Sequence, residues 1–337
     1  MRPFPSARGL KNLPSRREFM IATGSAVLAP PFRALAQSNS MPAIGLLDSA
    51  TSTPAELADF YAGLKVEGYI RNQTLAVRYH SAAGDYGRLP ALAADLVQHQ
   101  VAAITAIGVP AALAANKVTT TIPIIFAIAP DPVRSGLIGS LDKPGGNITG
   151  VTDLAAGRER KRLELLHALV PTAGEIALLV NPNNPNADAQ SRDAVAAADA
   201  IGVQLRPIRA GADDDFDTSF GALAALQPRG LVIADDELFD SRSTYLAFLA
   251  LHYRIPTIFQ GRAFAAAGGL MSYGSSLTET YHQAGVYSGM ILKGAVAGEL
   301  PVYQSTKIEF IVNARTAAAL GIAVPSAMLG AASEVIR

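Results

Sequence analysis

The chain has 337 residues, equal numbers of basic and acidic residues (28 each), 50% hydrophobic residues and no cysteine. A chain of this length buries large cores and usually divides into two domains. The missing cysteines exclude disulfides, thiol catalysis and a lipid-modified cysteine anchor. The balanced charge argues against a nucleic-acid partner, which requires a basic surface.

Residues 1–36 carry the pattern of an export signal. Six of the 28 basic residues and one of the 28 acidic residues lie here, so the rest of the chain is mildly acidic. The paired arginines of Ser15–Phe19 precede a weakly apolar run, Phe19–Leu28, and Ala34–Ala36 supplies small residues for signal peptidase. This order predicts a twin-arginine signal peptide, cleaved before Gln37, and a soluble periplasmic product. A basic disordered tail or a membrane anchor is the alternative, and the apolar run is shorter than the ~20 residues that span a bilayer.

The next part of the chain alternates apolar strands with amphipathic helices. Thr53 and Pro54 fit an N-cap followed by proline at the first helical position, and Gly68 ends that helix. The expected strands are Pro42–Leu47, Leu75–Tyr79, Val101–Ile107 and Ile122–Ile128, with further helices at Leu89–Gln98 and Ala111–Val118. With right-handed crossovers, this order predicts a parallel, doubly wound sheet.

The stretch Thr121–Thr152 is expected to hold both a ligand loop and a crossing between two lobes. It begins as a strand that is apolar on both faces, as a covered parallel strand should be. Pro130-Asp-Pro132 follows at the C-terminal end of that strand, where open α/β sheets bind ligands. The turn Lys143–Asn147 then leads into a new strand, Ile148–Thr152.

The pattern then repeats as a second α/β half. The expected helices are Arg158–Leu169, Ala187–Ala200, Phe216–Leu226, Tyr245–His252, Leu277–Leu292 and Arg315–Leu320, and the expected strands are Glu175–Val180, Val203–Ile208, Gly230–Ala234, Thr257–Phe259, Leu270–Tyr273 and Lys307–Val312. The long tail is predicted to return to the first lobe. We therefore expect an α/β fold of two doubly wound parallel-sheet lobes with a multi-segment hinge, the N-terminal lobe comprising 41–150 plus about 275–305 and the C-terminal lobe 151–274 plus about 306–337.

The sequence offers little for catalysis. The five histidines are scattered, and neither metal-binding spacing, a nucleophile elbow nor a phosphate loop is present. We therefore predict no catalytic residue, no metal and no cofactor. Polar loops do recur at strand C-termini, several of them at helix starts, whose free N–H groups attract anions. Together they predict a cleft for a small polar or zwitterionic solute, although Asp131 and Asn181–Pro185 would also serve as simple turn and cap residues.

Several segments resemble a known family. They are Arg88–Val97, Asp131–Val133, Pro144–Val151, Lys161–Leu166, Asn181–Asn186 and Gly268–Gly274. They are similar to the ABC-transporter substrate-binding protein family that includes tryptophan- and phenylalanine-binding members, over nearly all of the chain after the signal segment. The resemblance implies a type I periplasmic binding fold with a three-segment hinge. It also implies a monomer that captures a solute without chemistry and delivers it to an ABC transporter permease in the inner membrane.

The same resemblance implies which residues bind the ligand. They are Asp48, Ser49, Gly108, Val109, Asp131, Pro132, Asn181, Asp235, Phe259 and Tyr273. Val109 departs from the family, because amino-acid-binding members tend to offer a hydroxyl there. The chain also has no tryptophan, so Phe259, Tyr273 and Phe239 are the candidates to stack on an aromatic solute.

Three functions stay open at this point. A transport receptor for an amino acid or a related compound is the first. A periplasmic module that presents its ligand to a membrane signalling kinase is the alternative, and an α/β enzyme is the third, because a fold alone does not decide function. In the first two, Asp131 and Asp235 are expected to offer hydrogen bonds to one ligand from opposite lobes.

Overall fold

The computed structural model describes residues 41–152, 157–171 and 174–337. The expected signal peptide and its cleavage before Gln37 lie outside these residues. Met41–Arg337 form one compact unit. Within the described ranges, no helix is both long and apolar enough to cross a membrane.

Two mainly parallel sheets organise the described residues, which confirms the predicted α/β fold class. The first sheet has six strands in the order β11-β5-β4-β3-β1-β2. Its strands are β1 (Ala43–Asp48), β2 (Ala76–Ser81), β3 (Ala103–Ile107), β4 (Ile124–Ile128), β5 (Ile148–Thr152) and β11 (Tyr303–Gln304). We call this sheet and the helices that pack on it the first lobe.

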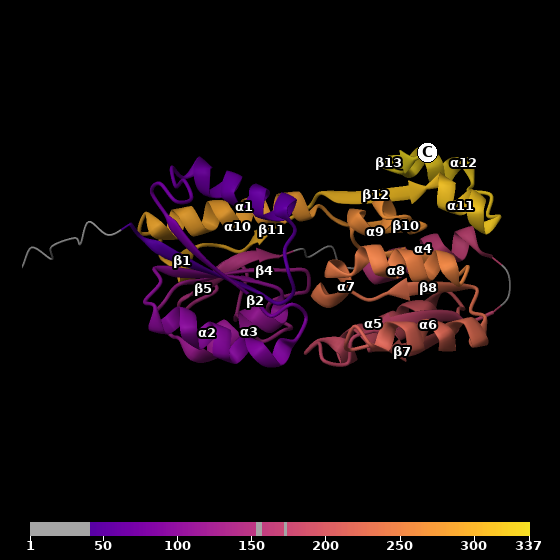
Figure 1. The fold of residues 1–337 in the computed structure, drawn as a ribbon, viewed down its shortest axis with the longest axis horizontal. Coiled ribbons are helices and arrows are strands. Elements are labelled where there is room, and N and C mark those ends of the chain that lie inside the picture. The colour runs from indigo at the N-terminus through magenta and orange to yellow at the C-terminus, as the bar shows by residue number, and fades with distance from the viewer. Residues whose placement is uncertain (1–40, 153–156, 172–173) are drawn as a thin grey trace, which may run out of the picture. The chain divides into compact units, whose positions relative to one another are not determined.

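Helices cover both faces of the first sheet (Figure 1). They are α1 (Pro54–Val66), α2 (Leu89–Gln98), α3 (Val109–Val118) and α10 (Leu277–Leu292), with 3-10 turns η1 (Tyr86–Arg88) and η2 (Ala297–Glu299). The α2 and α3 side buries Leu89, Leu96 and Phe126, and the α1 and α10 side buries Phe60 and Ile125. Burial on both faces explains why β1, β3 and β4 are near-continuous apolar runs in the sequence.

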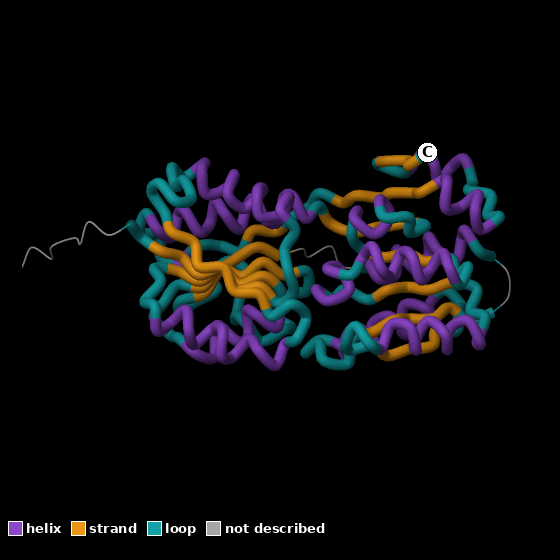
Figure 2. The backbone as a smooth tube through the Cα atoms, in the orientation of Figure 1, coloured by secondary structure: helices purple, strands orange, loops and turns teal. Residues whose placement is uncertain are grey.

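The second sheet has seven described strands in the order β13-β12-β10-β9-β8-β6-β7. The strands are β6 (Ile176–Val180), β7 (Leu205–Arg209), β8 (Gly230–Ile233), β9 (Thr257–Phe259), β10 (Met271–Ser275), β12 (Ile308–Asn313) and β13 (Glu334–Ile336). The helices are α4 (Arg158–Leu169), α5 (Ala187–Ala200), α6 (Asp215–Leu226), α7 (Glu237–Ser241), α8 (Ser243–His252), α9 (Arg262–Ala266), α11 (Ala314–Leu320) and α12 (Ser326–Ala331). Here too the helices pack on the strands (Figure 2), with one core around Leu163 and Leu166 and another around Phe216 and Phe259. This sheet and its helices are the second lobe.

The chain passes between the two sheets three times. The passages run from β5 to α4, from β10 to α10, and from β11 to β12. The second passage returns α10 to the first lobe, where it packs closely against α1. A Cβ at Gly63 would overlap the backbone carbonyl of His282, and a Cβ at Gly285 would overlap that of Phe60. Only glycine permits this close approach, so the two positions hold the returning helix on the first lobe.

The structure departs from the expectation of purely parallel sheets at β12. This strand pairs antiparallel with β10, because the chain enters the second sheet from β11 without an intervening helix to reverse its direction. The strands β11 and β13, of two and three residues, and the short helix α7 were not predicted. Elements of this length carry too few residues to show a period.

Candidate functional site

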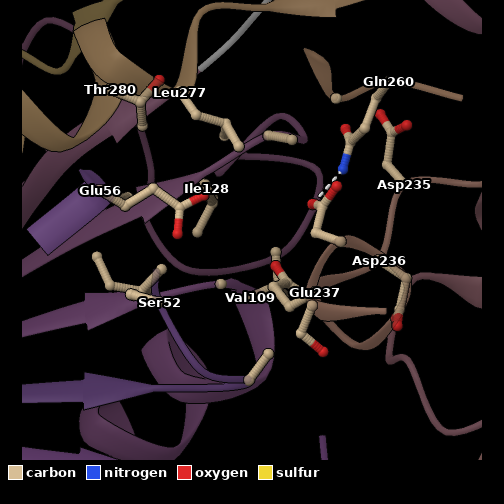
Figure 3. Close-up of a pocket in the computed structure, with 18 of the residues that line it drawn as sticks. Ser52, Glu56, Val109, Ile128, Asp235, Asp236, Glu237, Gln260, Leu277 and Thr280 are labelled. Carbon is tan, nitrogen blue, oxygen red and sulfur yellow. Dashed lines mark hydrogen bonds between the residues drawn. The ribbon is translucent and has the colours of Figure 1, made fainter. Parts of the chain in front are cut away.

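A cavity of about 130 Å³ lies between the two lobes and is lined from both. A cavity of about 150 Å³ admits a molecule the size of benzene. The first lobe contributes the loops after β1, β3 and β4 with parts of α1 and α10. The second lobe contributes the loop after β6 with the first turn of α5, the segment after β8, and the ends of β9 and β10. Figure 3 shows Ser52, Glu56, Val109, Ile128, Leu277 and Thr280 on one side, and Asp235, Asp236, Glu237 and Gln260 on the other.

Asp48 organises the loop after β1. Its carboxylate accepts hydrogen bonds from the backbone N–H groups of Ala50 (2.9 Å) and Ser52 (2.7 Å) and from the Tyr79 hydroxyl (2.7 Å). Burial and the Asp48 carboxylate raise the pKa of Tyr79 above its ordinary value, so this hydroxyl keeps its proton and acts as a donor. Asp48 therefore fixes the loop that forms this wall of the cavity, and the hydrogen bonds that do so all lie within the first lobe.

The adjoining Ser49 holds two first-lobe elements together. Its fully buried hydroxyl donates to the carbonyl of Ile107 (2.8 Å) and accepts from the N–H of Ala111 (3.0 Å). The serine thereby fixes the start of α3 relative to β1. Its role in the described structure is to position the wall, because it does not itself line the cavity.

The N-terminus of α3 meets a carboxyl group from the second lobe. Gly108, the N-cap, has φ +87°, and a Cβ there would lie 2.6 Å from the Glu237 carboxyl carbon and 2.6 Å from the Ser49 hydroxyl oxygen. Burial and then the neighbouring Asp236 carboxylate raise the pKa of Glu237 to about 8, although the backbone N–H of Val109 hydrogen-bonds to it and opposes the rise. Glycine is required here by both the backbone angle and the close approach.

The segment after β8 places acidic side chains along the second-lobe wall. The two carboxylate oxygens of Asp236 accept hydrogen bonds from the side-chain amides of Asn181 (3.0 Å) and Asn184 (2.7 Å). The Tyr86 hydroxyl of the first lobe also donates to Asp236, at 3.0 and 3.1 Å. Asp236 is therefore a point where the lobes touch. Burial raises its pKa in spite of these hydrogen bonds.

Asp235 is paired with a buried arginine. The Arg162 guanidinium, which is 0% exposed, donates to the Asp235 carboxylate, which is 8% exposed. Burial alone would raise the pKa of Asp235, but the guanidinium of Arg162 outweighs it and lowers the pKa. The neighbouring Arg158 donates to the Ser275 hydroxyl (2.8 Å) and to the carbonyl of Ala129 in the first lobe (3.3 Å). The two arginines thus hold the lining residues Ala129, Asp235 and Ser275 in place without lining the cavity themselves.

The structure brings four of the ten predicted site residues to the cavity. Asp48, Gly108, Val109 and Asp235 line it, whereas the other six do not: Ser49, Asp131, Pro132, Asn181, Phe259 and Tyr273. Asn181 supports Asp236, as described. Asp131 caps its own turn, since its carboxylate accepts from the N–H of Val133 (2.8 Å). It lines an adjoining pocket, which shares Ala129, Pro130, Asn186, Gln190 and Asp235 with the cavity.

The three aromatic residues expected to stack on a solute lie elsewhere. Phe259 is fully buried in the second-lobe core beside Phe264. Tyr273 packs edge-on against Phe310, and Phe239 packs against Phe216. Their alternation along strands and helices directs them into the core. Among the described lining residues, Tyr281 is the sole aromatic side chain, and its hydroxyl is hydrogen-bonded to that of Ser52 (2.8 Å).

Several lining residues were missed by the sequence analysis. They include Glu56, Asp240 and Thr280. The signal at Glu56 was present, because Thr53 and Glu56 form a capping box, but this pattern does not reveal that the helix start faces a second lobe. Asp240 lies on the unpredicted helix α7, and its carboxylate accepts from the side-chain amide of Gln260 (2.6 Å).

A cavity lined by strand ends of two α/β lobes, with three chain passages between them, defines a two-lobe solute-binding protein. Residues 49–336 match the family model described as "ABC transporter substrate binding protein". The chain belongs to this family. The resemblance found in the sequence is therefore confirmed, and this is a family of solute-binding proteins and not of enzymes.

The chain is also similar to individual proteins of known ligand or known structure. The chain is 27% identical over 261 residues to a tyrosine-binding protein of Clostridioides difficile (strain R20291), covering 77% of this chain and 75% of that protein. A conserved domain protein of Vibrio cholerae has a similar structure, with TM-score 0.81 and 25% identity over 88% of this chain and 100% of that one. A protein from Streptococcus pneumonia, solved in complex with L-Trp, shares the fold with TM-score 0.76 and 24% identity over 87% of this chain and 100% of that one.

The described residues do not provide a metal centre. No group of three or more His, Cys, Asp or Glu side chains in the described ranges is arranged to hold a metal ion. The carboxylates around the cavity are instead engaged with amides, hydroxyls, backbone N–H groups and Arg162, as described above.

Proposed function

We propose that this chain is the periplasmic receptor of an ABC import system, acting as a monomer that delivers one small solute to a permease in the inner membrane. The observation that carries the proposal is the cavity between the lobes, whose lining residues come from the strand ends of both. Family membership adds that such proteins bind small molecules and work with membrane transporters. The tyrosine-binding relative makes amino acids and related compounds the first solutes to test.

Capture is proposed to proceed by closure of the lobes around the solute. The first lobe offers the loop after β1 and the start of α1, and the second lobe offers the segment after β8 and Gln260. Because only the closed state satisfies contacts to both lobes, the solute shifts the population towards it. Three connecting segments provide the hinge, as in other proteins that close around ligands.

A thermal-shift screen of amino acids, amines, small carboxylates and purine-like solutes tests this proposal. A solute at 100 times its dissociation constant stabilises the folded state by about 2.7 kcal/mol. For roughly 300 residues this amounts to a rise of about 4 °C in melting temperature. At least one class of solute is expected to produce it. Turnover of a bound solute into a product would contradict the receptor function.

Export is tested separately. The order of residues in 1–36 leads us to propose that the chain enters the periplasm and is cleaved before Gln37. Mass spectrometry of the periplasmic protein is expected to give a mass that starts at Gln37. A cytoplasmic product that retains Met1 would contradict the proposed location without bearing on solute binding.

A further inference from the structure

Acidic side chains of the two lobes meet at the cavity. The second lobe contributes Asp236, Glu237 and Asp240, which we call the acidic cluster, and the first lobe contributes Asp48 and Glu56. Both first-lobe residues add negative charge beside members of the cluster. Carboxylates that approach one another away from water disfavour each other's ionisation. The distance between the lobes therefore acts on the protonation of the cluster.

The first lobe covers two members of the cluster. The Tyr86 hydroxyl donates to the Asp236 carboxylate at 3.0 and 3.1 Å. The Glu237 carboxyl group lies against Gly108 and the N–H of Val109 at the start of α3. Burial and the charges of Glu237 and Asp236 raise the pKa of Tyr86, so its hydroxyl stays a donor. Each of these contacts joins one lobe to the other, so opening the lobes breaks them and admits water to both carboxyl groups.

The third member, Asp240, is near an acid of the first lobe. One of its oxygens accepts from the Gln260 amide at 2.6 Å, whereas the other, Oδ1, is buried and has no hydrogen-bond partner among the described residues. Burial raises the pKa of Asp240, and the charges of neighbouring acids, Glu56 among them, raise it further. A proton on Asp240 removes the repulsion from Glu56, and separation of the lobes removes it by distance.

Two arginines lie beside the cluster, but both act first on another acid. Arg162 is paired with Asp235, and the charge of Arg158 also lowers the pKa of Asp235. The charge of Arg162 reaches Asp240 as well, yet the pKa of Asp240 is still raised. The acidic cluster thus stays undercompensated while the lobes are together.

The other arginines near the cleft face away from the cluster. Arg242, which follows α7, pairs with Asp213 at 2.9 Å. Arg134 and Arg160 of the adjoining pocket pair with other exposed carboxylates, and Arg192 of that pocket is exposed on α5. None of the described residues that line the cavity itself is Lys, Arg or His.

We infer that closure of the two lobes takes up protons at the acidic cluster, so that a falling pH favours the closed state and a rising pH favours the open one. This regulation rests on the lobe closure of the proposed function and does not depend on which solute is bound.

Glu237 gives the pH range of the effect. With the lobes in contact its pKa is raised from an ordinary 4.5 to about 8. Between these values the closed state binds a proton that the open state has lost. Closure is therefore favoured most below about pH 4.5, and the advantage is lost as the pH rises through 8. One such proton changes the ratio of closed to open molecules by up to about tenfold for each pH unit.

Distances between the lobes test this without a solute. Because the chain has no cysteine, Ala91→Cys on α2 and Ala222→Cys on α6, both at exposed positions, place one spin label on each lobe. Pulsed electron paramagnetic resonance from pH 5 to 9 is expected to show a longer, open distance that grows with pH. The ratio of closed to open molecules should fall roughly 10- to 100-fold between pH 6 and 8. Circular dichroism at each pH verifies that the chain stays folded.

Variants then locate the protons. Glu237→Gln carries a neutral side chain at every pH and keeps an acceptor for the N–H of Val109. It should make the fall in the closed-to-open ratio between pH 6 and 8 about tenfold smaller. The matched control is Asp199→Asn, which removes an exposed carboxylate of α5 outside the cavity lining. It should change the pH response by less than about twofold, because exposed distant charges are screened.

A third variant covers the case in which the labelled protein is closed at every pH. Tyr86→Phe removes the hydroxyl that joins the lobes at Asp236. It should lower the closed-to-open ratio roughly tenfold at each pH, which brings the open state into view and leaves the cluster in place.

Three results overturn the inference. The first is a distance distribution that stays the same from pH 5 to 9 in both the labelled protein and its Tyr86→Phe variant. The second is opening of the lobes as the pH falls. The third is an undiminished pH response in Glu237→Gln, because the protons then bind elsewhere. The receptor function is decided separately, by the solute screen.

Discussion

The buried pair of Arg162 and Asp235 is expected to be a structural requirement of the second lobe. Asp235→Asn keeps the size of the side chain and removes its charge, which leaves the fully buried guanidinium of Arg162 with only the longer ion pair to Glu159 (Nη2 to Oε1, 3.8 Å). Breaking a buried pair in this way costs about 3–5 kcal/mol. Unfolding of roughly 300 residues carries an entropy of about 0.6 kcal/mol/K, so the melting temperature should fall by about 5–8 °C.

Differential scanning calorimetry checks this value, and the chain provides a control of the same chemistry. Arg262 and Glu334 form a two-point pair at 3.0 and 2.8 Å, with side chains 54% and 40% exposed. Because exposed pairs contribute about 0–1 kcal/mol, Glu334→Gln should lower the melting temperature by less than about 2 °C.

A double replacement tests whether the loss of stability arises from the buried charge of Arg162. Arg162→Met with Asp235→Leu removes both charges and should recover most of the stability lost in Asp235→Asn, because replacing a whole buried pair by apolar groups is often neutral. An Asp235→Asn protein that melts with the wild type would refute the reasoning. So would a double variant less stable than the single one, since the loss would then not arise from an unpaired buried charge.

Three further changes have defined outcomes. Gly285→Ala should destabilise the folded protein by about 1–3 kcal/mol, because the new methyl group overlaps the carbonyl of Phe60. The control Gly221→Ala, on the open face of α6, should stabilise the folded protein by about 0.5–1 kcal/mol. Equal chemical-denaturation midpoints for the two variants would contradict the close contact between α1 and α10. Asp131→Ala should lower the melting temperature, because the variant loses the hydrogen bond that caps its turn. Solute affinity should be unchanged in calorimetric titration. A loss of affinity would show that Asp131 takes part in solute binding. Because the pKa of Glu237 is raised to about 8, its contribution to the free energy of unfolding is complete below about pH 4.5 and is lost as the pH rises towards 8. The raised pKa values of Asp236 and Asp240 act in the same direction. Glu237→Gln should therefore reduce, but not abolish, the fall in melting temperature between pH 5 and 8, and an unchanged pH profile would contradict the raised pKa of Glu237.

The fold could be predicted from the sequence because its signals are local. Strands such as Ile124–Ile128 are apolar on both faces, and caps such as Thr53 mark where helices begin. The family model then confirmed the class of protein. The antiparallel direction of β12 could not be predicted. Strand direction depends on how the chain re-enters the sheet, and the residue pattern of the strand does not reveal it.

The cavity could be predicted only in part, because its lining depends on the lobes meeting. Asp48, Val109 and Asp235 were found since they follow strands at the ligand-binding edge of a parallel sheet. Glu56 and Asp240 lie on helices, where acidic residues ordinarily face water, and only the opposite lobe makes them cavity residues. Phe259 illustrates the converse, since an aromatic side chain at a strand end points into the core or out of it according to the pleat.

Capture of a solute between the two lobes is tested most directly by a crystal structure grown with the best-binding solute of the screen. Density for that solute is expected in the cavity, in contact with Ser52 or Glu56 of the first lobe and with Asp240 or Gln260 of the second. Density confined to one lobe or to another surface, with this cavity filled only by water, would contradict it.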